Sequence, residues 1–143
     1  MNDGRVLGAG LDLVENARMD AMMRRWGRRF RDRVFTPDEQ RYCDAKAVPH
    51  RHYAGRWAVK EAVSKAFGTG ISTAIAWLDI EVVNDSGSGA PSVRLSSRAR
   101  RFAERCGVAG ILISLSHTRE YAVAQAILTG SGPCGRRGGE NLS

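Results

Sequence analysis

Cysteine is scarce in this 143-residue chain, and the few cysteines present form no recognisable pattern. Cys43, Cys106 and Cys134 are unevenly spaced, and no Cys-x-x-Cys pair occurs. A disulfide framework or a structural zinc site needs regularly paired cysteines. We therefore expect neither, and the reducing cytoplasm is the expected location of the protein.

Long hydrophobic runs are also missing. No apolar stretch approaches the ~18 residues that a membrane-spanning helix needs. Residues 1–5 are not followed by the apolar core of a signal peptide. A hydrophobic content of 43% and a charged content of 26% are ordinary for one globular domain of this length. The sequence thus predicts a single domain without a membrane partner.

Acidic residues are outnumbered, with 15 Asp and Glu against 22 Lys and Arg, so the formal net charge is +7. Such an excess favours an anionic partner: nucleic acid, an acidic protein or a phosphorylated small molecule. The arginines gather at residues 18–33 and 94–105, although basic runs of this kind can also be solvated helix faces. A nucleic-acid-binding module is the competing class. Because the chain has no recognition motif and no aromatics interleaved with the basic runs, we expect no nucleic-acid partner.

Hydrophobic periodicity and capping signals predict an α+β domain in which a small antiparallel sheet packs against one long helix and shorter helices. The clearest helix start is at Thr36, where Pro37 occupies the first helical position and Glu39 completes a capping box. The predicted strands are 6–14, 80–84, 92–95, 111–116 and 121–128. The predicted helices are 16 to about 26, 36 to about 45, 53–67 and 96 to about 106. We assign residues 1–128 to the domain and 129–143, rich in Gly, to a flexible C-terminal tail.

The predicted helix at 53–67 carries a charged pair on its apolar side. Glu61 and Lys65 project within the stripe formed by Ala54, Trp57, Ala58 and Ala62. An ion pair on this side must be desolvated, which costs several kcal/mol per ion unless something compensates. The pair is either partly solvated, with its aliphatic stems over the core, or it meets a ligand. A metal ion and a phosphate would together satisfy the carboxylate and the ammonium.

Asp12 presents a similar problem on the first predicted strand. It shares one face with Gly8 and Gly10, and such glycines indicate close approach of another backbone or of a ligand. An unpaired carboxylate there would be costly. Its partner is either an arginine, in a purely structural role, or a metal ion.

Histidine offers one candidate for a polar site. His117 lies at the bend after the strand at 111–116, where Ser114 and Ser116 share the face opposite the apolar one. A lone histidine at a strand end can also be a simple surface residue. His50 and His52 do not share a helix face, so we expect them to be surface residues and not zinc ligands.

Four segments together resemble the short, trimeric holo-acyl-carrier-protein synthases, a family of 4′-phosphopantetheinyl transferases. They are residues 10–13 (GLDL), 54–66 (AGRWAVKEAVSKA), 68–71 (GTGI) and 114–118 (SLSHT). The resemblance covers roughly residues 5 to 128 in order and at matching spacing. It implies the 4′-phosphopantetheinyl transferase fold and transfer of phosphopantetheine from coenzyme A to a serine of apo acyl carrier protein, with release of adenosine 3′,5′-bisphosphate.

The resemblance also implies roles for individual residues. Asp12 and Glu61 are the expected ligands of one Mg²⁺ that bridges to the coenzyme A diphosphate, and Lys65 is expected to stabilise the transition state. These three are the predicted catalytic residues. The predicted coenzyme A-binding residues are Arg56, Lys65, Gly68, Thr69, Gly70, His117 and Thr118, of which the turn at 68–70 is expected to offer backbone N–H groups. For the general base, Glu61 or a water on the metal is favoured over His117, and the sequence does not decide between them.

A basic first helix docks the acidic carrier protein in this family. Arg18 matches the docking arginine best, and Arg25, Arg28 and Arg29 are further candidates together with Arg24. The resemblance further implies a homotrimer whose active sites form between neighbouring subunits, and a place in fatty acid biosynthesis and lipid metabolism, although the carrier could equally belong to polyketide synthesis. Ala90 before Pro91 departs from the family, which usually has Lys or Arg there, and no counterpart of the tail is known to us.

Overall fold

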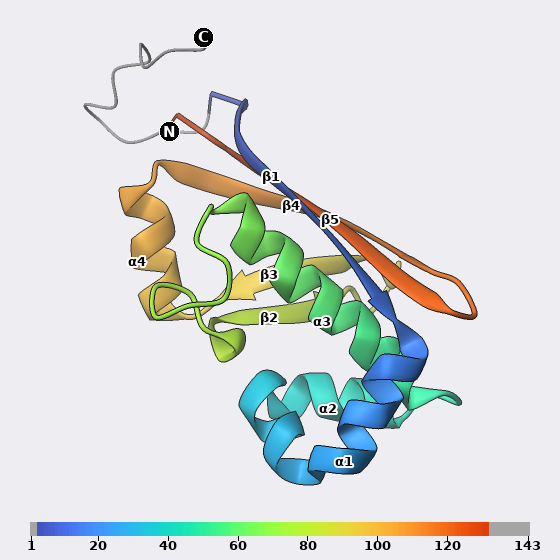
Figure 1. The fold of residues 1–143 in the computed structure, drawn as a ribbon. Coiled ribbons are helices and arrows are strands. Elements are labelled where there is room, and N and C mark those ends of the chain that lie inside the picture. Colours follow the sequence, from blue (N-terminus) through green and yellow to red (C-terminus); the bar gives the residue numbers. More distant parts are fainter. Residues whose placement is uncertain (1–2, 132–143) are drawn as a thin grey trace, which may run out of the picture.

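A three-stranded antiparallel sheet and a separate two-stranded ribbon are arranged around one central helix (Figure 1). The computed structural model describes residues 3–131. The three-stranded sheet has the order β1-β5-β4, and β2 pairs with β3. The elements in chain order are β1 (Arg5–Glu15), α1 (Asn16–Val34), α2 (Pro37–Asp44), α3 (Pro49–Ala66), the 3₁₀ turn η1 (Trp77–Asp79), β2 (Ile80–Asn84), β3 (Pro91–Leu95), α4 (Ser97–Arg105), β4 (Val108–His117) and β5 (Tyr121–Gly130).

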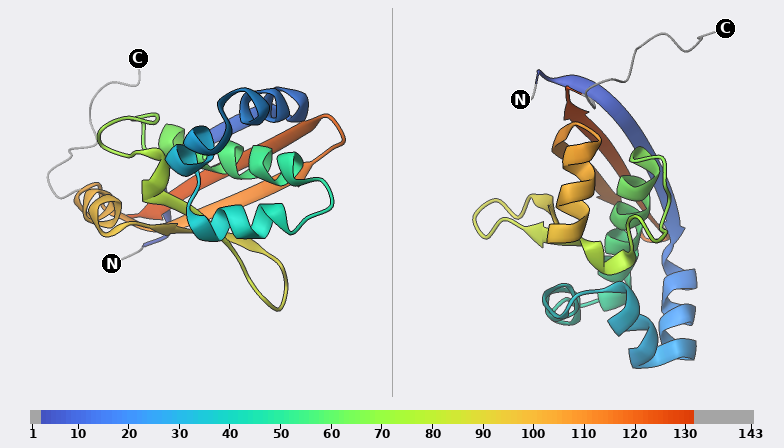
Figure 2. Two further views of the ribbon diagram at one scale, coloured as in Figure 1. Left: turned by 90° about the horizontal axis from the view of Figure 1, so that it is seen from below. Right: turned by 90° about the vertical axis from the view of Figure 1, so that its left-hand side faces the viewer.

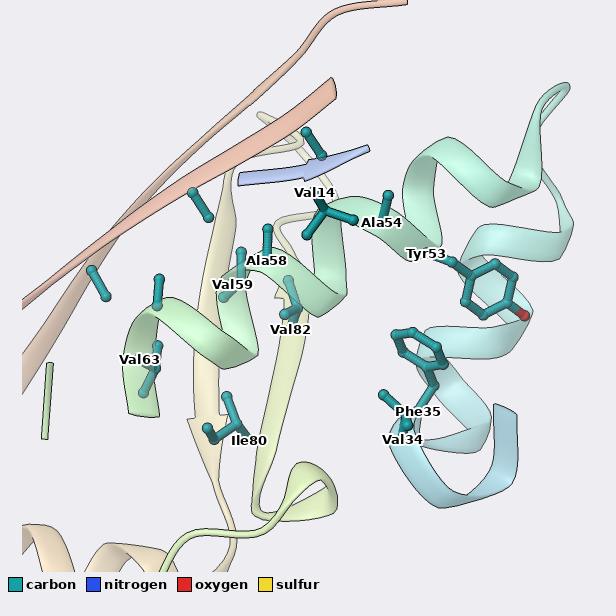
Figure 3. Close-up of a cluster of buried hydrophobic side chains, with 14 of the residues drawn as sticks. Val14, Val34, Phe35, Tyr53, Ala54, Ala58, Val59, Val63, Ile80 and Val82 are labelled. Carbon is teal, nitrogen blue, oxygen red and sulfur yellow. The ribbon is translucent and has the colours of Figure 1, made fainter. Parts of the chain in front are cut away.

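The central helix α3 lies against the sheet so closely that two positions of β1 require glycine. A Cβ on Gly10 would lie 2.0 Å from the carbonyl oxygen of Ala62, and one on Gly8 would lie 2.1 Å from that of Ala66. The glycines of the first strand therefore allow the backbone of α3 to pack closely against β1. Of the two possibilities that the sequence indicated, another backbone or a ligand, this is the first. Figure 3 shows the core that results, with Val14 of β1 close to Ala54 of α3.

All the described helices lie on one side of the three-stranded sheet, and no element of residues 3–131 covers its other face (Figure 2). Because side chains alternate along a strand, this outer face carries Leu11 and Leu13 of β1 and Leu112 of β4. These leucines are 62%, 62% and 61% exposed. Three exposed leucines on one face of a sheet offer apolar surface to a partner.

The predicted order and type of the regular elements are confirmed. Thr36 forms the expected capping box with Glu39, and Ser96 caps α4. The domain boundary expected at residue 128 falls inside β5, which continues to Gly130. Most of the expected tail, from residue 132 onward and including Cys134, lies outside the described residues. Cys43 and Cys106 are free thiols.

α1 consists of two helical segments that meet at Gly27, whose φ of 57° only glycine adopts easily. The first segment ends where the sequence predicted, near Trp26, but the second segment, which continues to Val34, was not predicted. The role expected for Asn16 was wrong, because Asn16 is the first helical residue and not the cap. Its side-chain amide instead donates to the carbonyl oxygens of Thr118 and Arg119, at 3.1 and 3.0 Å. Asn16 therefore ties the start of α1 to the turn between β4 and β5.

A fully buried ion pair that sequence reasoning missed joins α2, α3 and β2. Lys60 Nζ lies 2.7 Å from Glu39 Oε1 and donates to the carbonyl oxygens of Trp77 and Ile80, at 3.0 and 2.6 Å. Glu39 in turn accepts the backbone N–H of Thr36 and, at 2.9 Å, that of Val82. All three N–H groups of the ammonium thus have an acceptor, which is the condition for burying a charge without a large penalty.

Lys60→Met is expected to destabilise the fold by about 3–5 kcal/mol, because it leaves the Glu39 carboxylate buried without a cation. Urea unfolding at a fixed protein concentration measures the loss. The double variant Lys60→Met, Glu39→Gln should regain part of it, since both charges are then gone. Arg41→Ala removes only the exposed pair with Asp38 and should cost no more than about 1 kcal/mol. A loss below that figure for Lys60→Met would contradict the prediction.

Within the described residues, no helix combines the length and the apolar character needed to cross a bilayer.

Candidate functional site

The predicted catalytic residues meet between β1 and α3. Lys65 Nζ lies 3.0 Å from Asp12 Oδ1 and 3.1 Å from the carbonyl oxygen of Leu11. Glu61 lies one helical turn before Lys65, on the same side of α3. A hollow of about 290 Å³ opens beside them, lined by Asp12, Leu13, Val14, Glu15, Arg18, Met22, Trp57, Glu61 and Lys65. We call this site the carboxylate hollow.

The carboxylate hollow holds more negative charge than its lysine compensates. Asp12 Oδ2 is buried and has no hydrogen-bond partner among the described residues. Burial and the nearby Asp12 carboxylate raise the pKa of Glu61, and Lys65 opposes this shift. A divalent cation would supply the missing partner of Asp12 Oδ2 and would stabilise the ionised form of Glu61. Asp12 and Glu61 therefore fit a site for Mg²⁺, an ion that needs few protein carboxylates.

Glu61→Gln is expected to raise the melting temperature of the metal-free protein at pH 7.5. The folded-state pKa of Glu61 lies above its ordinary value of 4.5, so ionisation of Glu61 opposes folding. The resulting loss of folding stability is fully present above the folded-state pKa and disappears as the pH falls towards 4.5. The difference between variant and wild type, measured in EDTA, should therefore shrink on acidification. A difference that stays constant between pH 7.5 and 5 would argue against the raised pKa.

The turn after α3 is formed as predicted, but its N–H groups are engaged. Gly68 and Gly70 have φ angles of 79° and 61°. The amides of Gly68, Thr69 and Gly70 donate to carbonyl oxygens of the last turn of α3, at 2.9, 3.3 and 3.1 Å. The expectation that the turn offers free backbone donors is therefore not met. What it does offer is space, because a Cβ on Gly68 or on Gly70 would meet no atom within 4 Å.

The other predicted coenzyme A-binding residues gather elsewhere. Arg56 of α3 is 2% exposed; its Nη2 donates to Asn84 Oδ1, and its guanidinium lies 3.9 Å from the centre of the Tyr42 ring. His117, at the end of β4, packs on Gly55, where a Cβ would lie 2.5 Å from its Cε1. Thr118 Oγ1 accepts the N–H of Tyr121 at 2.9 Å and so shapes the turn between β4 and β5.

The position of His117 differs from the expectation based on Ser114 and Ser116. Those serines lie on the outer face of the sheet, whereas His117 lies on the inner face with Leu115, against α3. The reason is strand alternation: odd-numbered residues of β4 face the helix. His117 thus belongs to a site beside α3 and not to one with the two serines.

The two groups of predicted residues lie at opposite edges of the sheet. Asp12 is on β1, and the register places Leu115 of β4 two strands away from it, across Ala124 of β5. Two strand spacings amount to about 10 Å. Figure 1 shows α3 running beneath the sheet. Gly10 of β1 lies against Ala62, the neighbour of Glu61, whereas Gly55 lies against His117 of β4. One chain does not bring all the predicted site residues together.

Sequence reasoning missed one residue of the second group. His52, expected on the surface, is half-buried, and its ring centre lies 5.6 Å from that of His117 and 6.0 Å from that of Tyr42. Lys46 Nζ lies 4.5 Å from the centre of the Tyr42 ring. We call Lys46, His52, Arg56 and His117 the imidazole cluster. The helical periodicity of 49–66 could have placed His52 and Arg56 on one side of the helix, but not His117 beside them.

The predicted docking arginines are divided by the bend in α1. Arg18 is exposed and lines the carboxylate hollow. Arg25 lies over the ring of Trp26, at 4.9 Å, and Arg24 pairs with Asp20 at 3.2 Å. Arg28 and Arg29 are exposed beyond the bend at Gly27.

Comparison with known proteins agrees with these observations. The family model described as the 4′-phosphopantetheinyl transferase superfamily matches residues 8–126. A holo-[acyl-carrier-protein] synthase of Ruminiclostridium cellulolyticum is 48% identical over 121 residues, which cover 84% of this chain and 90% of the relative. One of Protochlamydia amoebophila is 46% identical over 122 residues, covering 85% and 96%.

Solved structures of such synthases share the fold. That of Neisseria meningitidis has a TM-score of 0.81 at 27% identity and covers 87% of this chain and 98% of its own. That of Bacillus anthracis, in complex with CoA (3′,5′-ADP), has a TM-score of 0.73 at 34% identity and covers 88% and 98%.

Proposed function

The chain belongs to the 4′-phosphopantetheinyl transferase superfamily, and we propose that it transfers the 4′-phosphopantetheine group of coenzyme A to a serine of apo acyl carrier protein. The products are holo carrier protein and adenosine 3′,5′-bisphosphate. The observation that carries the proposal is the carboxylate hollow, in which Asp12, Glu61 and Lys65 meet on a fold shared with a coenzyme A-bound synthase. The reaction belongs to lipid metabolism, with fatty acid synthesis as its proposed setting and the cytoplasm as its proposed location.

The transfer exchanges one P–O bond for another. The serine Oγ attacks the phosphorus that carries the pantetheine arm, and the bond from that phosphorus to the adenosine bisphosphate oxygen breaks. The serine proton leaves for a base, and Glu61, a carboxylate that lines the hollow, is the residue proposed for this role.

Lys65 and the two carboxylates have different proposed roles towards the diphosphate of coenzyme A. The Lys65 ammonium, held by Asp12 in the free protein, is placed to bind phosphate oxygens as a point charge and to stabilise charge on them in the transition state. Asp12 and Glu61 would hold Mg²⁺, which when bound neutralises charge that develops on the departing diphosphate oxygen.

Intact-mass spectrometry of an apo acyl carrier protein tests the reaction. Incubation with the full chain, coenzyme A and Mg²⁺ should add one phosphopantetheine group, and EDTA should prevent the addition. No gain in mass on several acidic carrier proteins, with a folded protein in hand, would overturn the proposed function. A gain in mass that persists in EDTA would support the transferase activity but contradict the proposed need for Mg²⁺.

We further propose that the protein is a homotrimer whose active sites are shared between neighbours. Two observations support this assembly. The carboxylate hollow and the imidazole cluster lie at opposite edges of one chain's sheet, so a neighbouring copy can bring the second next to the first. The uncovered outer face of the sheet, with Leu11, Leu13 and Leu112, supplies apolar surface for the contact.

The carrier protein is proposed to dock on α1 through Arg18, which lines the carboxylate hollow. Arg18→Glu should raise the KM for an acidic carrier protein about tenfold, a loss of roughly 1.4 kcal/mol, because a like charge then faces the acidic partner. The KM for coenzyme A should stay nearly the same. Steady-state kinetics at low salt measure both constants. Arg101→Glu on α4 makes the same charge change away from the hollow and is the control; carrier kinetics unchanged by Arg18→Glu would refute the docking role.

A further inference from the structure

The imidazole cluster concentrates positive charge, and no described residue supplies its counter-ion. Lys46, His52, Arg56 and His117 come from three separate segments, and within the part of the chain that the structure describes the Arg56 guanidinium donates only to the neutral amide of Asn84. Within residues 3–131, none of the four takes part in an ion pair. The cluster is therefore prepared for an anion that the chain itself does not supply.

Carboxylates close to the cluster are already engaged. A second hollow beside Tyr42 and Arg56 also contains Asp38, Glu81 and Asp85 in its wall. Asp38 pairs with Arg41, and Glu81 lies 3.5 Å from Arg94. Asp85 accepts hydrogen bonds from Gly87 and Ser88. Asp38 and Glu81 are thus paired with other cations, and Asp85 is held by neutral donors of its own turn, so none of the three forms an ion pair with the imidazole cluster.

Both imidazoles respond to this excess of positive charge. Burial lowers the pKa of His52, and His117, Lys46, Arg56 and Arg51 lower it further. Burial and then Arg56 lower the pKa of His117. Both rings are thus neutral at pH 7 in the free protein. A bound dianion would reverse the sign of the local potential, raise both pKa values and draw protons onto the rings.

We propose that His52 is a further binding residue for the 3′-phosphate of coenzyme A, which it holds together with His117. The inference rests on the proposed function, since coenzyme A is the ligand. Geometry carries it: the 5.6 Å between the two ring centres lets both imidazoles reach one phosphate group, with Arg56 and Lys46 close behind. The 3′-phosphate is the one phosphomonoester of coenzyme A and reaches its dianionic form near neutral pH. Under the proposed shared site, the diphosphate of the same coenzyme A binds in the carboxylate hollow of a neighbouring subunit.

Calorimetric titration of the full chain with adenosine 3′,5′-bisphosphate tests the role of His52. In buffers of different ionisation enthalpy, the wild type should take up protons on binding near pH 7. His52→Phe keeps a ring between Tyr42 and His117 but cannot be protonated. It should take up fewer protons and bind about tenfold more weakly at pH 6, with a much smaller loss at pH 8, because only a charged ring adds an ionic hydrogen bond.

Two controls separate a binding role from a structural one. His50→Phe changes the same helix two residues earlier, beside Asp20 at 3.8 Å, and should leave proton uptake unchanged. Dephospho-coenzyme A lacks the 3′-phosphate, so His52→Phe should bind it as well as the wild type does. Since the chain has three histidines, NMR signals of the ring Cε1–H groups can be assigned from single variants and followed with pH.

The outcomes distinguish this inference from the proposed function. Wild-type proton uptake and affinity in His52→Phe would overturn the role of His52 while phosphopantetheine transfer remains intact. Equal losses for coenzyme A and dephospho-coenzyme A would assign His52 a purely structural role and would also overturn it. Failure of the wild type to modify any carrier protein would count against the proposed function instead.

Discussion

Replacing Glu61 with glutamine is expected to slow phosphopantetheine transfer by at least about a thousandfold while leaving the protein folded. Glutamine has nearly the same shape, so the hollow between β1 and α3 stays filled. It cannot become anionic, and with Asp12 alone the hollow would hold a divalent cation weakly. It also cannot accept the serine proton.

Two measurements distinguish these contributions. Intact-mass time courses with saturating coenzyme A and carrier protein give the rate, and thermal shifts with added Mg²⁺ report metal binding without turnover. The wild type should gain stability with Mg²⁺ and the variant should not. Glu104→Gln on α4, remote from the hollow, should match the wild type in both assays. Substantial turnover of Glu61→Gln in excess Mg²⁺ would remove Glu61 from the list of metal ligands.

The parts of the fold that sequence predicts well are those with local signals. The Thr36 capping box and the glycine after α3 are complete within a few residues, so neither depends on the rest of the molecule. Gly27 ends the first helical segment of α1, as its local signal predicts, but the second segment, which continues to Val34, was not predicted. Asn16 looks like a cap, yet it bonds across more than 100 residues to the β4–β5 turn. Its partners could not be read from its neighbours.

The site divides in the same way. The sequence indicated Glu61 and Lys65 by their i, i+4 spacing and Asp12 by its neighbouring glycines. The structure brings these three side chains together. The burial of Lys60, adjacent to Glu61, has no local signal, because its partner Glu39 reaches it only through tertiary packing. The sequence also could not predict that the carboxylate hollow and the imidazole cluster lie apart, since this depends on which strand occupies which edge of the sheet.

The shared active site makes the second strong prediction: two inactive variants should restore each other. Glu61→Gln disables the carboxylate hollow, and Arg56→Gln disables the imidazole cluster of the same chain while keeping an amide near Asn84. If each site combines the hollow of one subunit with the cluster of the next, a mixed trimer contains one interface where both halves are intact. Differently tagged variants, co-expressed and purified over both tags, should therefore show about one third of wild-type activity.

If the active site were instead complete within one chain, the mixed trimer should show no activity, because every chain would carry a defect in its own site. Each variant purified alone should be inactive at a coenzyme A concentration near the wild-type KM, and each should melt cooperatively, so that unfolding does not imitate inactivity. A Leu112→Arg change, placed on the outer face of the sheet, provides the structural counterpart. Leu112 does not line the carboxylate hollow and is not part of the imidazole cluster, so the change puts a charge into the apolar contact alone and should abolish both the trimer and the recovery. Activity retained by a monomeric Leu112→Arg protein would refute the shared site directly.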